Sequence, residues 1–304
     1  MKLNSMTGFG SSQCDLGVVA GLPEWEGTRL NVDIRSVNGR FLDIHLRLPD
    51  EWRMLETSMR EVIAQHLTRG KIELRASCSP SNSLSHAQSA SHWQNLKAQE
   101  ELALSFFPQA RQLSVAEVLR LSDRPNPEAG LIAGALRTLC VQAVQALLVM
   151  RQQEGKQLAE AMLTRTHTLR ELVQHALPLV PHWIETQKVR FLQKWQESLE
   201  HVGTQVSADA ARERALTEAT ALALRVDVSE ELTRLTAHLD AIESTIRGTS
   251  ASEGIGKRLD FLIQELHREA NTLGSKSTSL SLTQIAVDMK VLIEQMREQV
   301  QNIE

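Results

Sequence analysis

Two glutamates, Glu265 and Glu269, stand four residues apart in the segment Gly254–Ser277. If this segment is a helix, residues four positions apart lie on the same side, so the two carboxylates can approach one ion. Carboxylates completed by water suit Mg²⁺ or Mn²⁺, the cations that serve phosphoryl chemistry. We therefore take Glu265 and Glu269 as candidate metal ligands, and we expect another helix or another subunit to supply the remaining ligands.

Acids and histidines also recur along one edge of each of two predicted helices. At i, i+4, i+7 and i+11 the first helix carries Asp227, Glu231, Arg234 and His238, and the second carries Asp260, Gln264, His267 and Asn271. Imidazole exchanges protons near neutral pH, and carboxylates can assist it. The catalytic candidates are therefore Glu231, His238, Asp260 and His267. At roughly 100° per residue, the Asp260 edge is separate from the Glu265 edge, so the segment should serve two surfaces.

Basic side chains that could hold phosphate groups flank these acids and also occur near the N-terminus. With one amide, Asn271, the candidates for contact with a phosphate-bearing partner such as RNA are Arg35, Arg40, Arg69, Lys71, Lys257, Arg258, Arg268, Asn271 and Lys276. Between Arg29 and Arg75 the sequence has nine bases against seven acids, which is a weak basic patch. Phosphate neutralisation is local, and an oligomer would multiply such a patch.

A simpler interpretation exists for every one of these residues. Most charged residues on helices are solvated, and intrahelical ion pairs are common, so Asp227 with Arg234 or Glu265 with Arg268 need no further role. A single histidine on a helix edge is more often structural than catalytic. Spacing alone therefore does not identify a nuclease.

The N-terminal part that must position these bases has the pattern of an α+β domain. Apolar and polar residues alternate in Leu30–Arg35, in Phe41–Leu48 and in Ile72–Cys78, which predicts three strands. The Asn38-Gly39 pair between the first two predicts a hairpin turn. Asp50 is expected to cap a helix that runs to about Leu67.

The rest of the chain is predicted to be mostly helical. We expect a Ser-rich linker near 79–91, an interrupted helical stretch over 93–124, and a domain boundary near 125. This divides the chain into 1–125 and 126–304. In the second part the apolar spacing predicts helices over 131–177, from 182 onward, over 208–246, from 255 to an interruption at Gly274–Ser277, and over 283–303. The first part should be a small mixed domain of hairpin, helix and strand, and the second a long-helix region that assembles as an oligomer.

Composition excludes several classes of protein. The 304 residues include three dispersed cysteines, which indicates neither a disulfide framework nor a Cys-based zinc site and suits a reducing cytoplasm. No secretory signal and no run of about 20 apolar residues is found, so we expect no membrane partner. The net charge of −4 and the 4% aromatic content argue against a duplex-coating protein and against a base-stacking platform. No P-loop, Rossmann glycine pattern or Gly-x-Ser-x-Gly motif occurs.

The sequence resembles the YicC/YloC family of bacterial proteins from its first residues to its last. The segments that carry the resemblance are Ser5–Phe9, Arg35–Asn38, Arg40–Asp43, Leu67–Lys71, Arg151–Gly155, Asp227-Val228, Glu230–Leu232, Arg234-Leu235, Gly256–Phe261, Gln264-Glu265, Arg268-Glu269, Asn271–Leu273, Ser275–Ser277 and Lys290–Gln299. The stretch from about 79 to 130 matches poorly.

The resemblance implies a cytoplasmic, divalent-metal-dependent endoribonuclease that acts in small-RNA or mRNA turnover. It also implies a homo-oligomer, a hexamer in this family, with RNA and other RNA-decay enzymes as partners. One alternative is a non-catalytic RNA-binding adaptor that passes RNA to another nuclease, which needs the bases but not the carboxylates. A second is a structural helical assembly protein, which needs only the apolar stripes.

Overall fold

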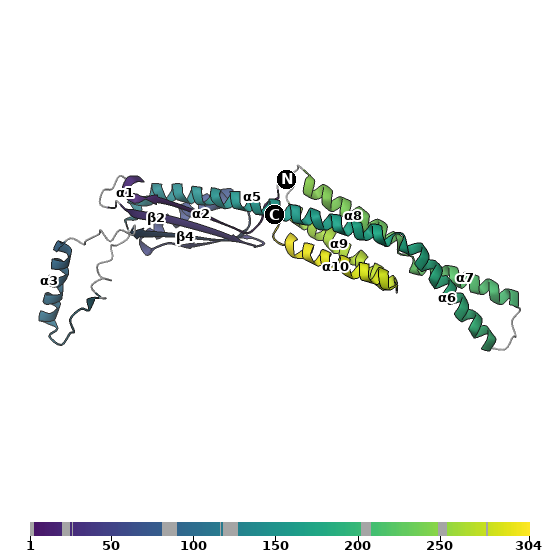
Figure 1. Cartoon of the computed structure of the whole chain (residues 1–304). Coiled ribbons are helices and arrows are strands. Elements are labelled where there is room, and N and C mark those ends of the chain that lie inside the picture. Colours follow the sequence, from purple (N-terminus) through teal and green to yellow (C-terminus); the bar gives the residue numbers. More distant parts are fainter. Residues whose placement is uncertain are drawn as a thin grey trace. The chain divides into compact units, whose positions relative to one another are not determined.

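The computed structural model describes residues 3–19, 25, 27–80, 90–115, 117, 127–201, 208–248, 254–277 and 279–304. The fold is α+β, as predicted: a four-stranded mixed sheet with helices is followed by a long helical region (Figure 1). The chain divides into two compact units. We call Thr7–Met150 the sheet unit, and Met1–Met6 with Arg151–Glu304 the helical unit.

The strands of the sheet unit lie in the order β1-β2-β4-β3, which differs from the expected hairpin. β2 (Thr28–Val37) and β3 (Leu42–Arg47) are not neighbours, because β4 (Gly70–Pro80) lies between them, antiparallel to β2 and parallel to β3. The Asn38-Gly39 loop crosses the start of β4, where a Cβ at Gly39 would lie 2.9 Å from the Lys71 nitrogen. The chain therefore does turn between β2 and β3 as predicted, but the prediction that these two strands pair with each other was wrong.

Strand β1 (Gly8–Asp15) was not predicted, and its contacts with a helix explain why. It pairs antiparallel with β2 and lies against α5 (Ala129–Ala176). A Cβ at Gly10 would lie 2.1 Å from the carbonyl oxygen of Ala143, and the Ser12 hydroxyl donates to the Leu139 carbonyl at 2.7 Å. Because the helix approaches so closely, the inward positions of β1 hold small residues, and the strand lacks apolar alternation.

The core of this unit lies between one face of the sheet and the helices that cover it. The inward side chains of the two central strands are fully buried against η2 (Asp50–Leu55), α2 (Glu56–His66) and the first part of α5. Asp50 opens the 3-10 turn η2 rather than capping α2, and Pro49 occupies the N-cap position without a side-chain hydrogen bond. α5 is long and apolar enough to cross a membrane. Ile132, Leu136 and Leu147 in this helix are buried against the sheet, and 39% of its most apolar stretch is buried within the described structure.

The helical unit contains the rest of α5, then α6 (Leu179–His201), α7 (Ala208–Val226), α8 (Ser229–Arg247), α9 (Ile255–Lys276) and α10 (Leu280–Val300). One helix was expected over 208–246, but two form. The break is at Asp227-Val228, where the Asp227 carboxylate accepts hydrogen bonds from the Ser229 amide and hydroxyl at 2.8 and 2.6 Å. Leu224, expected on the apolar stripe, is consequently 73% exposed. α9 continues through Gly274, which was expected to interrupt it.

Two further predicted segments lie partly within the described residues. α3 (Ala90–Phe106) matches the first part of the helical stretch expected over 93–124, and residues 118–124 lie outside the described residues. The expected Ser-rich linker overlaps the end of β4 and the start of α3, and 81–89 likewise lie outside the described residues.

Residues 4–6 pair with residues 302–304 in the helical unit. Ser5 and Ile303 form an antiparallel bridge, and the Met6 amide donates to the Asn302 carbonyl at 2.8 Å. Arg151 is 2% exposed and donates from its guanidinium to the Ser5 carbonyl and to the Glu304 carboxylate. A glycine permits the close approach of α9, since a Cβ at Gly256 would lie 2.4 Å from the Ile303 carbonyl oxygen.

Candidate metal centre

The candidate site lies along the contact between α8 and α9. Leu232, Leu235 and Leu239 on α8 and Leu259, Leu262 and Leu266 on α9 are all buried, so the two predicted apolar stripes do face the core. Ion pairs join Glu231 to Lys276 and Arg234 to Glu269. Because higher numbers on α8 meet lower numbers on α9, the two helices run antiparallel.

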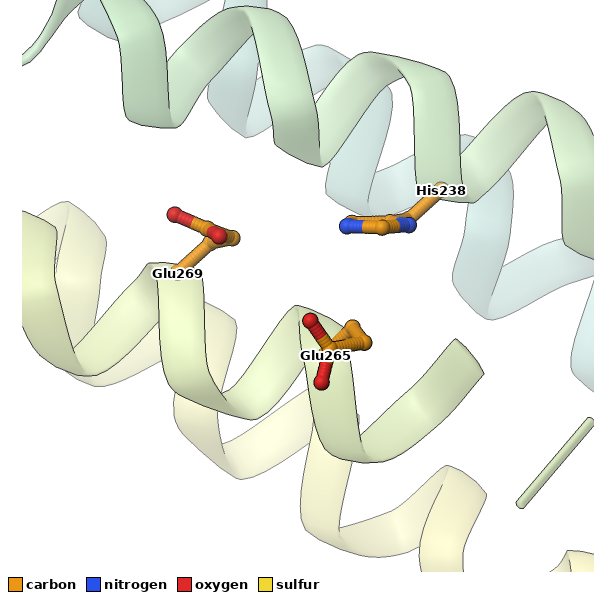
Figure 2. A group of neighbouring side chains, drawn as sticks. All are labelled: His238, Glu265 and Glu269. Carbon is orange, nitrogen blue, oxygen red and sulfur yellow. The ribbon is translucent and has the colours of Figure 1, made fainter. Parts of the chain in front are cut away.

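Three side chains meet in this contact with their ligand atoms close together. His238 extends from α8 toward Glu265 and Glu269 of α9 (Figure 2). One ring nitrogen of His238 and one carboxylate oxygen from each glutamate all lie within 4.8 Å of one another. Glu269 is 4% exposed, and the other two are half-buried. One imidazole and two carboxylates at this separation can share one divalent cation.

Arg234 lies beside this group and links it to the exposed edge of α8. Its guanidinium forms an ion pair with Glu230 one turn earlier and lies 3.5 Å from an oxygen of Glu269. Glu230 and, less strongly, Glu269 raise the pKa of Arg234, so it stays charged. The separation from Glu269 exceeds the 2.7–2.9 Å of a strong charge-assisted hydrogen bond. The buried carboxylate is thus only partly compensated.

Glu231 and Lys276 form a second charged contact farther along the same helices. Lys276 Nζ lies 2.8 Å from Glu231 Oε1 and 3.3 Å from the Asp227 carbonyl oxygen. The buried Oε2 of Glu231 has no hydrogen-bond partner in the described part of the chain. This contact ties the C-terminal end of α9 to the N-terminal end of α8, which holds the two helices in register beside the candidate centre.

The other predicted edge of α9 takes no part in the His238 group. Gln264 donates to the Asp260 carboxylate at 2.9 Å, and Asn271 lies 3.1 Å from a ring nitrogen of His267. These i, i+4 contacts run along α9 itself. The acid, the amides and the histidine of this edge therefore pair among themselves.

The predicted RNA-contact residues occur in both units. Arg35 and Lys71 are exposed on β2 and β4, Arg40 stacks over the Phe41 ring at 5.4 Å, and Arg69 is half-buried at the start of β4. In the helical unit Lys257, Arg258 and Arg268 are exposed on α9.

Sequence reasoning did not identify His238 as a metal ligand or Arg234 as a neighbour of Glu269. Both residues belong to a pair with the same four-residue spacing as the glutamates. Arg234 and His238 are one turn apart on α8, as Glu265 and Glu269 are on α9. Knowing that the helices pack antiparallel would have placed these two pairs opposite each other.

Two comparisons with known proteins cover almost the whole chain. Residues 3–160 match "Endoribonuclease YicC-like, N-terminal region", and residues 180–304 match "Endoribonuclease YicC-like, C-terminal". The protein named "Probable endoribonuclease YicC" of Haemophilus influenzae is 34% identical over 90% of this chain and 92% of its own length. The protein of the same name from Clostridioides difficile is 26% identical over 99% of both chains. The chain belongs to the YicC-like endoribonuclease family.

Proposed function

We propose that this protein is a divalent-metal-dependent endoribonuclease whose cation is held by His238, Glu265 and Glu269. The observation that carries the proposal is the convergence of three ligand atoms within 4.8 Å between two antiparallel helices. The family supplies the reaction, which is cleavage of RNA phosphodiester bonds. We take Mn²⁺ or Mg²⁺ as the cation, and a small regulatory RNA or messenger RNA as the substrate.

The electrostatics of the three side chains support a cation. Two carboxylate oxygens that lie within 4.8 Å of each other repel by about 3.5 kcal/mol or more at an effective dielectric constant of about 20. In the described structure the two glutamates form ion pairs only with Arg234, at 3.5 Å, and Arg268, at 4.0 Å. A divalent ion between the carboxylates replaces this repulsion by attraction to both.

The chain contributes binding and orientation to the proposed reaction. A bound divalent cation would stabilise the charge that develops on the phosphate and lower the pKa of a water molecule. Arg234 would orient Glu269, and its exposed guanidinium could also approach an RNA phosphate. We propose no proton transfer by Asp260 or His267, since both lie outside the three-residue group. Glu231 instead fixes Lys276 and with it the register of the helices.

The cellular setting is part of the proposal. Three free cysteines suit a reducing cytoplasm, where we place the protein. We propose that it acts as a homo-oligomer, a hexamer by the family resemblance, and that other RNA-decay enzymes process its products. Light scattering of the purified protein tests the oligomeric state.

The proposal is tested by incubating the pure protein with a structured RNA in Mn²⁺, in Mg²⁺ and in chelator. Cleavage should require the cation, and Glu269→Gln and His238→Ala should each lose roughly 100-fold, or about 2.7 kcal/mol of transition-state stabilisation. Glu294→Gln, which removes an exposed glutamate of α10, is the matched control and should cleave normally. Cleavage by Glu269→Gln at the wild-type rate would exclude this metal centre. RNA that is bound but never cleaved in Mn²⁺ would support the adaptor alternative instead.

A further inference from the structure

The face of the sheet opposite the core is open and carries alternating charges. The outward positions of β2 and β4 include Asp33, Arg35, Glu73 and Arg75, while the residues between them on each strand are buried. A hollow of about 440 Å³ opens on this face, lined by Phe9, Asp33, Ile34, Arg35, Glu73 and Arg75. None of these residues belongs to the candidate metal centre.

Strand register brings two arginines and one aromatic ring to this hollow. Phe9 is directly opposite Arg35, and Asp33 is directly opposite Arg75. Arg35 and Arg75 are therefore diagonal neighbours on adjacent strands, with Cβ atoms about 7–8 Å apart. Phe9 is 48% exposed on the edge strand, so its ring is available to a ligand.

In the described part of the chain, the two arginines of the hollow form no ion pair. Arg47 of β3 forms an ion pair with Glu73 at 2.7 Å, which occupies one of the two acids. Neither Arg35 nor Arg75 forms an ion pair with any residue that the structure describes. Two unpaired guanidinium groups then face a single remaining carboxylate, that of Asp33. With Arg47, three arginines meet two acids at this hollow, in a chain whose net charge is −4.

We propose that this hollow binds a single-stranded segment of the RNA substrate, a binding surface separate from the metal centre. The inference depends on the proposed function, because it takes RNA as the substrate. Arg35 and Arg75 would each contact a backbone phosphate, and one base would stack on Phe9. The free carboxylate of Asp33 can accept hydrogen bonds from an exocyclic amino group of a base.

The test measures RNA binding in chelator, where cleavage does not interfere. The probe is a labelled, unstructured oligoribonucleotide of about 12 nucleotides, within the usual range for one single-strand binding surface. Each phosphate contact to a single strand adds about 0.7 to the slope of log affinity against log salt concentration. The double variant Arg35→Gln/Arg75→Gln should therefore reduce that slope by about 1.4. The control Arg29→Gln removes an exposed arginine of β2 outside the hollow and should leave the slope unchanged.

A second variant tests the aromatic contact independently of charge. Phe9→Leu keeps an apolar side chain but removes the stacking surface. Loss of one base–aromatic stack should weaken binding by roughly 5- to 150-fold without changing the salt slope. Binding and salt slopes equal to wild type in both variants would overturn the proposal. A change in the oligomeric state of either variant, with RNA affinity intact, would show that the hollow contacts another copy of the chain and would also overturn it.

The two proposals fail in different ways. If the oligoribonucleotide binds through the hollow but no RNA is cleaved in Mn²⁺, the endoribonuclease proposal fails and the binding surface stands. If RNA is cleaved with the expected dependence on Glu269 while the hollow variants bind normally, only the binding surface is wrong.

Discussion

Replacing Glu265 by Gln should change the stability of the helical unit in opposite directions with and without a divalent cation. In chelator the two carboxylates repel by about 3.5 kcal/mol at an effective dielectric constant of about 20. The Glu265 side chain is 26% exposed, so solvent screens much of this repulsion, and we expect Glu265→Gln to add about 1 kcal/mol. The ion pair that is lost is weak, because Arg268 is 4.0 Å away and 73% exposed.

In Mn²⁺ the order should reverse. At a Mn²⁺ concentration of about 100 times Kd, a ligand that binds only the folded state adds about 2.7 kcal/mol. For a unit of about 160 residues each kcal/mol corresponds to roughly 2–4 °C, so Tm of the wild type should rise by roughly 5–10 °C. Glu265→Gln lacks one of three ligands and should gain little.

Thermal unfolding followed by far-ultraviolet circular dichroism, with calorimetry to resolve the two units, measures both effects. Glu294→Gln is the matched control, because Glu294 is also paired at i, i+3 with an exposed arginine, at 3.5 Å. It should respond to Mn²⁺ as the wild type does. An equal gain from Mn²⁺ in the wild type and in Glu265→Gln would refute the metal centre. A lower stability of Glu265→Gln in chelator would refute the repulsion on which the estimate depends.

Three further predictions concern the scaffold. Arg151→Met should lower the free energy of unfolding by about 3 kcal/mol in urea titrations, because buried acceptors lose a charged donor; a loss under about 1 kcal/mol would contradict this. Gly256→Ala should cost about 1–3 kcal/mol, since its Cβ would lie 2.4 Å from a backbone oxygen, whereas Gly134→Ala, with nothing within 4 Å, should gain up to about 1 kcal/mol; equal effects would be inconsistent with the structure. Burial raises the pKa of the Cys140 thiol to about 11. The unfolded chain, with an ordinary thiol pKa near 9, then releases the proton first, so this thiol's contribution to stability is full below about pH 9 and is lost as the pH rises toward about 11. Cys140→Ala should lack this alkaline loss in pH-dependent unfolding experiments, and an identical pH profile would count against it.

The helices were largely predictable because their stability comes from apolar stripes that the sequence displays. The break between α7 and α8 was missed, since it depends on a local competition in which the Asp227 carboxylate takes the Ser229 amide away from a continuous helix. In the sheet, the alternation in β2, β3 and β4 was visible, but the pairing was not. Strand order depends on contacts between residues far apart in the sequence, and a turn signal reports only on neighbours.

For a similar reason, the sequence predicted two of the three side chains of the candidate metal centre as ligands and not the third. Spacing alone brings Glu265 and Glu269 to one side of a helix, whatever that helix packs against. Assigning His238 as the third side chain requires the direction and register of α8 against α9. The leucine stripes and the Glu231–Lys276 contact set this direction and register. The sequence displays the stripes, but it does not show which way the two helices run against each other or which residues meet.

The bridge between Ser5 and Ile303 has a consequence for how the protein is made. Residues 3–6 leave the ribosome early, but the residues that they pair with are synthesised about 300 positions later, roughly 15–60 s at about 5–20 residues per second. The sheet unit, Thr7–Met150, can fold during that interval. The helical unit cannot be completed in that time, because α9 contacts Ile303 at Gly256, and Ser5 and Met6 pair with Ile303 and Asn302. The unit that carries the proposed metal ligands is therefore completed only after Asn302 and Ile303 have been synthesised, and a chain truncated before Asn302 should lack nuclease activity.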